Sequence, residues 1–215
     1  SKLSNGFTPS DSSLDPNCPK CLVTSLKCLP ARRKVQSMSL DSLTNTELGI
    51  RQKRLGAFYT DSKVASFLVN WAVRNPNDRV LDPSFGGGVF LEAATKRITQ
   101  LGGTPTRQIF GVEIDRDVHQ SVHEQLSSRV GIPPESLMRS DFFGIHPGFI
   151  PKMSAVVGNP PFIRFHRFSG PAREHAQRRV AERGVVLSEL SSSWAAFVVH
   201  SASFLRNGGR LAMVV

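Results

Sequence analysis

The alternation of apolar and polar positions becomes regular only beyond about residue 46. Residues 1–45 are rich in Ser, Pro and Asn and show no sustained hydrophobic period, so we expect a poorly ordered or extended N-terminal segment. The next stretch is amphipathic and predicts a helix that Thr60 or Asp61 can cap. The spacing predicts that one apolar face of this helix carries Val64, Phe67, Leu68 and Trp71.

Short apolar runs that predict strands then alternate with longer stretches that predict helices. The predicted strands cover residues 79–82, 108–113, 136–142, 154–158 and 210–215. The predicted helices run from 89 to the glycines at 102–103, over 116–129, over 171–184, and over 188–206 up to the glycines at 208–209. Core candidates in the last helix are Trp194, Phe197, Val198 and Phe204.

This order of elements predicts βαβ units and therefore a mostly parallel sheet with helices on both faces. The fold class is α/β and Rossmann-like. In such sheets the ligand binds beyond the carboxyl ends of the strands, where the strand order reverses. We expect the functional residues to gather there.

The charge balance points to a polyanionic partner. The chain has 27 Lys and Arg residues against 17 Asp and Glu, a formal net charge of +10, which makes nucleic acid the first partner to consider. No apolar run approaches the roughly 18 residues of a membrane helix, and no signal peptide is recognisable, so we expect no membrane partner. The odd number of cysteines, three, is a poor basis for a set of disulfides. Together with the lack of a recognisable signal peptide, it indicates a reducing, cytoplasmic setting.

The cysteines all lie near the N-terminus. Cys18 and Cys21 have the spacing of half a zinc site, and Cys28 could add a third ligand. A fourth ligand is missing, since the first histidine of the chain is His119. We therefore expect plain thiols and no bound metal.

The glycine-rich turn after the first predicted strand is typical of a nucleoside site. In the segment that begins Asp82-Pro83, Gly86 and Gly88 would let the backbone approach a ligand, and the following helix offers free N–H groups. Glu113 ends the next strand, where a carboxylate can accept both hydroxyls of a ribose. A tight turn without a ligand is the simpler alternative.

The charges of this site narrow the choice of ligand. The turn lacks the Lys-Ser/Thr of a P-loop, so a nucleoside triphosphate is disfavoured. Asp82 would repel a pyrophosphate but suits a cationic amino group. S-adenosylmethionine, a nucleoside with an ammonium and a sulfonium, fits both Asp82 and Glu113.

Asn159-Pro160-Pro161-Phe162, after the fourth predicted strand, is the most specific motif in the chain. An aromatic amine is a poor nucleophile because its lone pair is delocalised into the ring. The Asn159 side-chain oxygen and the Pro160 carbonyl could accept its two N–H hydrogens and hold the nitrogen nearer tetrahedral geometry. Pro161 stiffens the turn, and Phe162 could stack on a base, worth about 1–3 kcal/mol. The motif predicts methyl transfer by positioning, without a metal or a covalent intermediate.

A basic segment follows this motif. In a duplex the amino group is paired and stacked, so the base must be flipped out while the protein grips the phosphates. The residues expected to contact phosphates include Arg164, Arg167, Arg178 and Arg179. Each of them could instead belong to a solvated helix face. Double-stranded DNA is therefore the expected partner.

With both sites described, the chain resembles the N6-adenine DNA methyltransferases of restriction–modification and related defence systems. The matching segments are Gly56-Ala-Phe-Tyr-Thr60, Asp82-Pro-Ser-Phe-Gly-Gly-Gly-Val-Phe-Leu91, Gly111-Val-Glu-Ile-Asp115 and Asn159-Pro-Pro-Phe162. The resemblance implies that Phe58, Tyr59 and Thr60 line the methionine end of the cofactor. It also implies that Ile114 packs on the cofactor's adenine, and that Asp141 and Phe142 contact the adenine edge.

The order of these segments resembles the family's gamma arrangement, in which target recognition follows the catalytic domain. We expect residues 46–215 to form the N-terminal part of that domain, with a recognition domain or subunit beyond the chain end. Family sheets normally have seven strands and this chain ends in the fifth, so we expect a fragment of a longer protein or a truncated gene product.

Two other hypotheses remain open at this point. Glutamine methyltransferases of release factors also use Asn-Pro-Pro-aromatic turns, so the acceptor could be an amide or amine in RNA or protein. The chain could also be a DNA- and cofactor-binding remnant without turnover. The segment from Gly56 to Thr60 and the basic C-terminal half favour DNA methylation.

Overall fold

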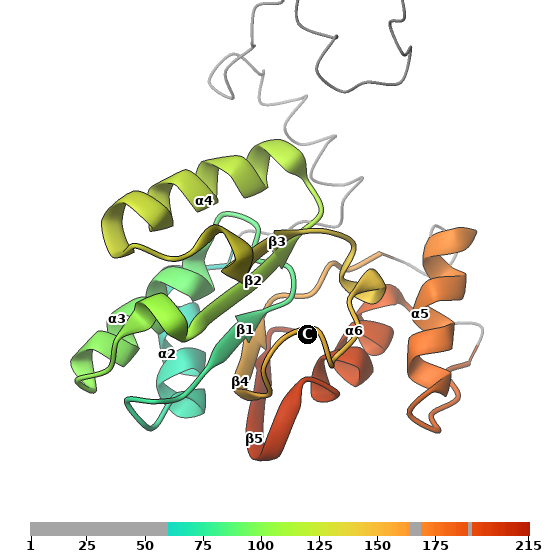
Figure 1. Ribbon diagram of the computed structural model, residues 1–215. Helices are drawn as coiled ribbons and strands as arrows, with labels where there is room; N and C mark the ends of the chain where they lie inside the picture. Colours follow the sequence, from blue (N-terminus) through green and yellow to red (C-terminus); the bar gives the residue numbers. More distant parts are fainter. Residues whose placement is uncertain (1–59, 164–168, 189–190) are drawn as a thin grey trace, which may run out of the picture. The chain divides into compact units, whose positions relative to one another are not determined.

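A computed structural model describes residues 60–163, 169–188 and 191–215, and its centre is a five-stranded sheet (Figure 1). The strands are β1 (Val80–Asp82), β2 (Ile109–Glu113), β3 (Leu137–Arg139), β4 (Met153–Gly158) and β5 (Leu205–Met213). They lie in the order β3-β2-β1-β4-β5, and every neighbouring pair is parallel. The α/β, Rossmann-like fold predicted from the sequence is confirmed.

Helices cover both faces of this sheet. One face carries α2 (Ser62–Ala72), α3 (Val89–Gln100) and α4 (Arg116–Val130), and the other carries α5 (Pro171–Ala181) and α6 (Ser193–Ala202). Each face of the sheet has its own hydrophobic core, and successive side chains of β4 point into the two cores alternately. Ala155 and Val157 pack on the α2–α4 side and Val156 packs on the α5–α6 side. Short 3₁₀ turns lie at Pro105–Arg107, Pro134–Ser136 and Phe142–Gly144. Within the described ranges, no helix combines the length and the apolar character needed to cross a bilayer.

Helix α2 begins where the sequence predicts but buries a different face. The Asp61 carboxylate caps it by accepting the backbone N–H two residues on, at 2.7 Å. Phe67 is 72% exposed, and Val64 and Trp71 are exposed as well. The buried residues of α2 are Ala65, Val69 and Ala72. Of the four residues on the predicted apolar face, only Leu68 packs against the core, where it is half-buried. The prediction is wrong for the other three, because this helix carries apolar residues on both sides and buries the smaller ones.

The last helix is shorter than predicted. It ends at Ala202, and β5 begins at Leu205, before the glycines that were expected to stop the helix. Gly208 and Gly209 lie inside β5, where its pairing register with β4 shifts. Gly208 has a φ of 72°, which suits glycine. These glycines form a bulge in the strand. Of the core candidates, Phe197 and Phe204 are buried, and Trp194 and Val198 are half-buried.

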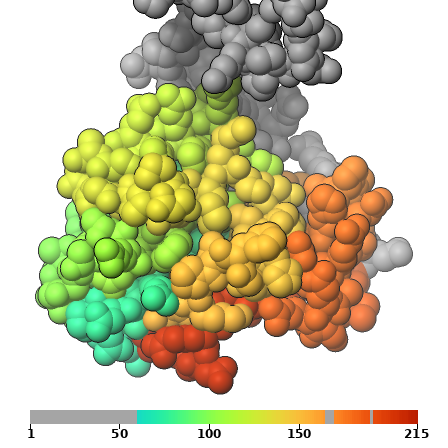
Figure 2. Space-filling view, viewed as in Figure 1, coloured from blue at the N-terminus to red at the C-terminus, as the bar shows by residue number. Residues whose placement is uncertain are grey.

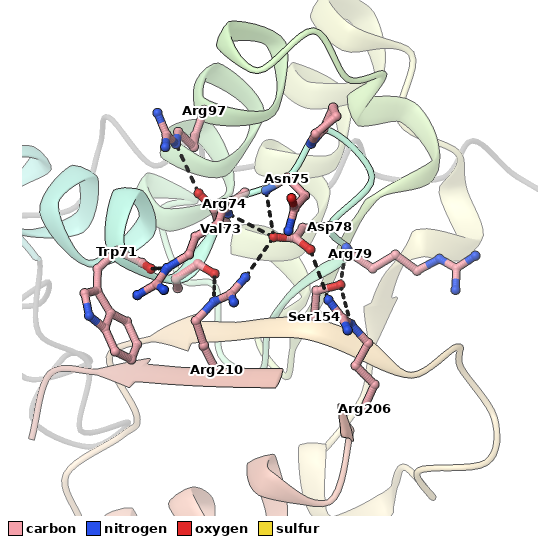
Figure 3. A network of polar contacts seen from close by, with 12 residues as sticks. Trp71, Val73, Arg74, Asn75, Asp78, Arg79, Arg97, Ser154, Arg206 and Arg210 are labelled. Carbon is pink, nitrogen blue, oxygen red and sulfur yellow. Dashed lines mark hydrogen bonds and ion pairs between the residues drawn. The ribbon is translucent and has the colours of Figure 1, made fainter. Parts of the chain in front are cut away.

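A buried carboxylate, Asp78, holds this bulged strand at the amino end of β1 (Figure 3). Its Oδ2 accepts hydrogen bonds from the backbone N–H groups of Arg74 and Asn75, at 2.9 and 3.1 Å, and from Arg210 Nη2 at 2.9 Å. Arg206 Nη2 lies 3.4 Å from Oδ1. Burial favours the neutral form, but these donors outweigh it and keep the pKa of Asp78 below its ordinary value. The network joins β5 to the loop before β1, at the end of the sheet opposite the candidate site.

Candidate active site

A cavity of about 370 Å³ opens at the carboxyl ends of the central strands. The chain passes from β1 to β2 on one side and returns to β4 on the other side of β1, so the crevice predicted at the reversal of strand order is confirmed. Predicted site residues that line this cavity are Thr60, Pro83, Gly86, Glu113, Ile114, Asp141, Phe142, Asn159 and Pro161. Phe58 and Tyr59 lie outside the described residues.

Glu113, at the end of β2, is held in the cavity wall by two backbone N–H groups. Its Oε2 accepts a hydrogen bond from the Gly86 N–H at 3.0 Å, and its Oε1 accepts one from the Asp115 N–H at 2.8 Å. The first of these bonds ties the strand end to the glycine turn. A carboxylate has about four acceptor positions, so two bonds leave capacity for a ligand hydroxyl on each oxygen.

The glycines of the turn play different parts. Gly86 lines the cavity, and its φ of 47° is one that side-chain-bearing residues rarely adopt. Gly88 precedes α3 and faces α4 instead: a Cβ at this position would lie 2.9 Å from Val122 Cγ1. Gly88 is not among the lining residues. Its geometry indicates close helix packing and not the ligand contact expected from the sequence.

Asp82 lies behind the cavity wall and is only 1% exposed. Its Oδ1 accepts a hydrogen bond from the Ser84 N–H at 3.1 Å, and its Oδ2 has no partner among the residues that the structure describes. Burial raises the pKa of Asp82 to about 8; the Ser84 N–H opposes this change and the Glu113 charge adds to it. The carboxyl group is therefore mostly protonated at neutral pH, and a nearby cation would favour its ionised form.

The wall formed beyond β2 and β3 is largely apolar. Strand β3 is shorter than predicted and ends at Arg139, so Asp141 and Phe142 lie in the loop that follows it. The Asp141 carboxylate accepts the Phe143 N–H at 3.1 Å and begins the 3₁₀ turn there. Phe142 is buried, whereas Ile114 is exposed at the cavity. This wall combines apolar surface with two acidic residues, Asp115 and Asp141.

The Asn-Pro-Pro-Phe turn lies directly beside the glycine turn. The Ser84 hydroxyl donates a hydrogen bond to the Asn159 backbone carbonyl at 3.3 Å. The Asn159 side-chain Nδ2 donates to Thr60 Oγ1 at 3.1 Å, so the side-chain carbonyl is turned away from Thr60. Asn159 and Glu113 line the same cavity. The two motifs predicted to serve the methyl donor and the methyl acceptor are thus brought together.

The remainder of this turn is held by the start of α6. Pro160 is buried, Pro161 lines the cavity, and Phe162 stands outside the lining and is 45% exposed. The Ser193 hydroxyl accepts the Ile163 N–H at 2.9 Å and donates to the Pro161 carbonyl. The exposed ring of Phe162 is therefore attached to an anchored backbone.

The arginines expected to contact phosphates differ in their surroundings. Arg164 and Arg167 lie outside the described residues. Arg178 is exposed on α5, which forms one side of the molecule in Figure 2. Arg179 is held within the fold: its Nε donates to the Phe143 carbonyl at 2.9 Å, and its Nη1 pairs with a glutamate three residues on at 3.1 Å. This geometry indicates a structural role, and we leave Arg179 out of the proposed DNA-contacting set.

Sequence reasoning missed several residues that line the cavity. Ser84 and Ser193 supply hydroxyl groups, while Ala172 and Phe197 supply apolar surface from α5 and α6. Three serines before an apolar stretch are a helix-start signal, which could have drawn attention to Ser193. No local signal marks Ala172 or Phe197, because the fold alone carries these helices to the cavity.

Comparison with known families gives a match over most of the chain. The model of the N-6 DNA Methylase family matches residues 46–215. The chain belongs to this family. The resemblance seen in the four sequence segments is thereby confirmed.

Individual relatives share less than a third of their residues with this chain over the aligned regions. The Type II methyltransferase M.XamI of Xanthomonas campestris pv. amaranthicola is 29% identical over 120 residues, which are 55% of this chain and 22% of that protein. The Type II methyltransferase M.HincII of Haemophilus influenzae is 24% identical over 163 residues, 74% of this chain and 27% of that protein. The chain thus spans about a quarter of the length of these curated relatives.

Among solved structures, the type I restriction-modification system methyltransferase subunit from Streptococcus thermophilus superposes with a TM-score of 0.58 at 20% identity. The superposition covers 78% of this chain and 37% of that subunit. At this identity the likeness shows the shared fold and nothing finer.

Proposed function

We propose that this methylase chain carries the site at which a methyl group passes from S-adenosylmethionine to the N6 amino group of adenine in DNA. One observation carries the proposal: the glycine turn, Glu113 and the Asn159 turn share one cavity, and the Ser84–Asn159 hydrogen bond joins the two turns. Such an arrangement can hold a methyl donor and an amine side by side. Membership of the N-6 DNA Methylase family supports adenine N6 as the acceptor.

The described residues fit S-adenosylmethionine, which when bound supplies an electrophilic methyl group on a sulfonium. Glu113 would accept the ribose hydroxyls on its remaining lone pairs. Ile114 and Phe142 offer apolar surface to the adenine of the cofactor, and Asp141 would face its edge. Their position at the ends of β2 and β3 is the one that nucleosides occupy in sheets of this class.

The methionine end of the cofactor would lie toward the glycine turn. Thr60 and Pro83 line this part of the cavity, and we propose that Phe58 and Tyr59 complete it. Asp82, behind the wall, would attract the ammonium group through its buried Oδ2, which has no hydrogen-bond partner among the described residues.

In the proposed mechanism the chain acts by holding the amine. The Asn159 side-chain oxygen and the Pro160 carbonyl would accept its two hydrogens, which localises the lone pair on nitrogen. The bond from Asn159 Nδ2 to Thr60 supports this assignment, because it directs the amide nitrogen toward Thr60 and the side-chain oxygen away from it. Pro160 and Pro161 limit the movement of the turn, so little order must be gained when the base arrives.

DNA would present the target adenine flipped out of the duplex. Phe162, which is partly exposed and lies in the turn beside the cavity, would stack on such a base. Arg178 on α5, together with Arg164 and Arg167, would contact phosphates. Because the relatives are much longer than this chain, we assign choice of the target sequence to a further recognition domain or subunit.

Transfer of labelled methyl groups by the full-length protein to duplex DNA, to RNA and to protein tests the proposal. Asn159→Ala should lower the rate of transfer to DNA on the order of 100- to 1,000-fold, because one of two acceptors is lost. Calorimetry should show nearly unchanged affinity for S-adenosylmethionine. Asn70→Ala is the matched control, since Asn70 is exposed on α2 and does not line the cavity.

Each competing hypothesis predicts a different outcome of this assay. Label in RNA or protein alone would show that the acceptor is an amide or amine in those substrates and not adenine in DNA. Binding of S-adenosylmethionine with no transfer to any substrate would identify a cofactor-binding remnant. Equal rates for Asn159→Ala and Asn70→Ala would refute the catalytic role of the turn.

A further inference from the structure

Serine hydroxyls hold two of three consecutive carbonyls in the Asn-Pro-Pro-Phe turn. Ser84 Oγ donates to the carbonyl of Asn159 at 3.3 Å, and Ser193 Oγ donates to that of Pro161 at 2.5 Å. Between residues within the described ranges, no hydrogen bond reaches the Pro160 carbonyl. The middle carbonyl, which the proposed function assigns to an amine hydrogen, therefore keeps its acceptor capacity.

Ser193 makes more contacts with this turn than the single carbonyl bond. It is the first residue of α6 and is 1% exposed. Its hydroxyl accepts the Ile163 N–H at 2.9 Å, and its own N–H donates to the Ile163 carbonyl at 3.1 Å. A hydroxyl has one hydrogen, and here that hydrogen goes to the Pro161 carbonyl. Both sides of the Pro161–Ile163 segment are thereby tied to α6.

The two prolines explain why the turn needs an outside residue. Pro160 and Pro161 have no N–H, so neither can donate a backbone hydrogen bond that would hold the turn. Their rings restrict φ, and the position before a proline restricts Pro160 further. The peptide that carries the Pro161 carbonyl can still rotate about ψ. The Ile163 N–H opposes this rotation through a long bond to the Pro161 carbonyl, at 3.3 Å. The Ser193 hydroxyl bonds the same carbonyl at 2.5 Å and so holds the residue that follows the Pro160 carbonyl.

We propose that Ser193 is a positioning residue for methyl transfer. By holding the Pro161 carbonyl and the Ile163 N–H, it keeps the Pro160 carbonyl aimed at the acceptor amine. This role rests on the proposed function, because it requires Pro160 to be the amine's acceptor. Ser193 acts through the turn and need not touch the base itself.

The test compares Ser193→Ala, Ser193→Thr and Ser192→Ala in the full-length protein. Ser192 is the N-cap of α6 and its side chain makes no capping bond, so Ser192→Ala is a matched loss of a neighbouring hydroxyl. The single-turnover rate of methyl transfer should fall up to about 100-fold in Ser193→Ala, since small displacements of reacting groups have effects of this size. KM for DNA and affinity for S-adenosylmethionine should change little. The melting temperature should fall by only a few degrees, because two hydrogen bonds of a buried hydroxyl are lost. Ser193→Thr keeps the hydroxyl and should recover most of the rate, and Ser192→Ala should match the wild type.

Two results would overturn the role of Ser193. One is a single-turnover rate in Ser193→Ala equal to that of the wild type; the other is a loss explained entirely by unfolding or weaker cofactor binding. If Ser193→Ala does not fold, Ser193→Cys, similar in volume but a weak donor, should show the same loss of rate. A wild-type protein that methylates none of DNA, RNA or protein would refute the proposed function itself. An active wild type with unaffected Ser193 variants would refute only the positioning role.

Discussion

Replacing Asp82 by Asn removes an ionisable group that the fold buries behind the cavity wall. In an unfolded chain its pKa is close to 3.8, whereas burial raises the pKa of Asp82 in the folded protein to about 8. Between these pH values the folded protein holds one proton that the unfolded chain has lost. The stability contributed by this carboxyl group is therefore complete below about pH 4 and is lost as the pH rises through about 8.

The size of the effect follows from this difference in bound protons. One proton changes the free energy of unfolding by about 1.4 kcal/mol per pH unit. Between about pH 4 and pH 7 the wild type should thus lose roughly 4 kcal/mol relative to Asp82→Asn. The amide of the variant brings its own unpaired groups, so the slope with pH, and not the offset between the proteins, is the quantity to compare.

Denaturant unfolding of both proteins at several pH values between about 5 and 8 measures this slope. The difference in unfolding free energy should move steadily in favour of Asp82→Asn as the pH rises. Asp117→Asn, at an exposed site in the first turn of α4, controls for the loss of a carboxylate. Parallel curves for the wild type and Asp82→Asn would show that Asp82 is not protonated in the fold, and the reasoning from burial would fail.

Two further predictions concern Glu113 and Gly158, which lie near Asp82. Glu113→Ala should weaken binding of S-adenosylmethionine by about 1.5–3 kcal/mol in calorimetry, because hydrogen bonds to a charged acceptor are lost; unchanged affinity would contradict its assignment, and Glu124→Ala, exposed on α4, is the control. Gly158→Ala should lower the free energy of unfolding by about 1–3 kcal/mol, since the new Cβ would lie 2.8 Å from Asp82 Oδ1. Gly144→Ala, whose nearest neighbour would be 3.7 Å away, should cost much less in the same denaturation experiment.

Much of the candidate site could be predicted because each of its motifs is a short, continuous segment. Pro160 and Pro161 restrict their own backbone, and the placing of Glu113 follows from the end of an apolar strand. The contacts that orient these motifs could not be predicted in this way. Asn159 bonds to Thr60 across 99 residues of sequence, and to the turn of Ser84 across 75. No pattern within either segment indicates that partner.

The same limit applies to residues whose contacts were predicted from their chemical type alone. Gly88 was expected to admit a ligand, but the side chain that it accommodates is Val122 of α4. Arg179 was expected to face phosphate, but its guanidinium binds the Phe143 carbonyl. Residue type tells what a group can bind, whereas the neighbouring elements decide what it does bind.

By itself the sequence determined the α/β class, the succession of strands and helices, and the two turns that meet at the cavity. These are local properties, written in hydrophobic period and in the backbone preferences of glycine and proline. Only the tertiary structure decided that α2 turns Ala65 and Val69 inward, that Asp82 is shut behind the wall, and that Ser193 anchors the proline turn. Each of these depends on how closely distant segments approach one another, and packing between elements sets that distance.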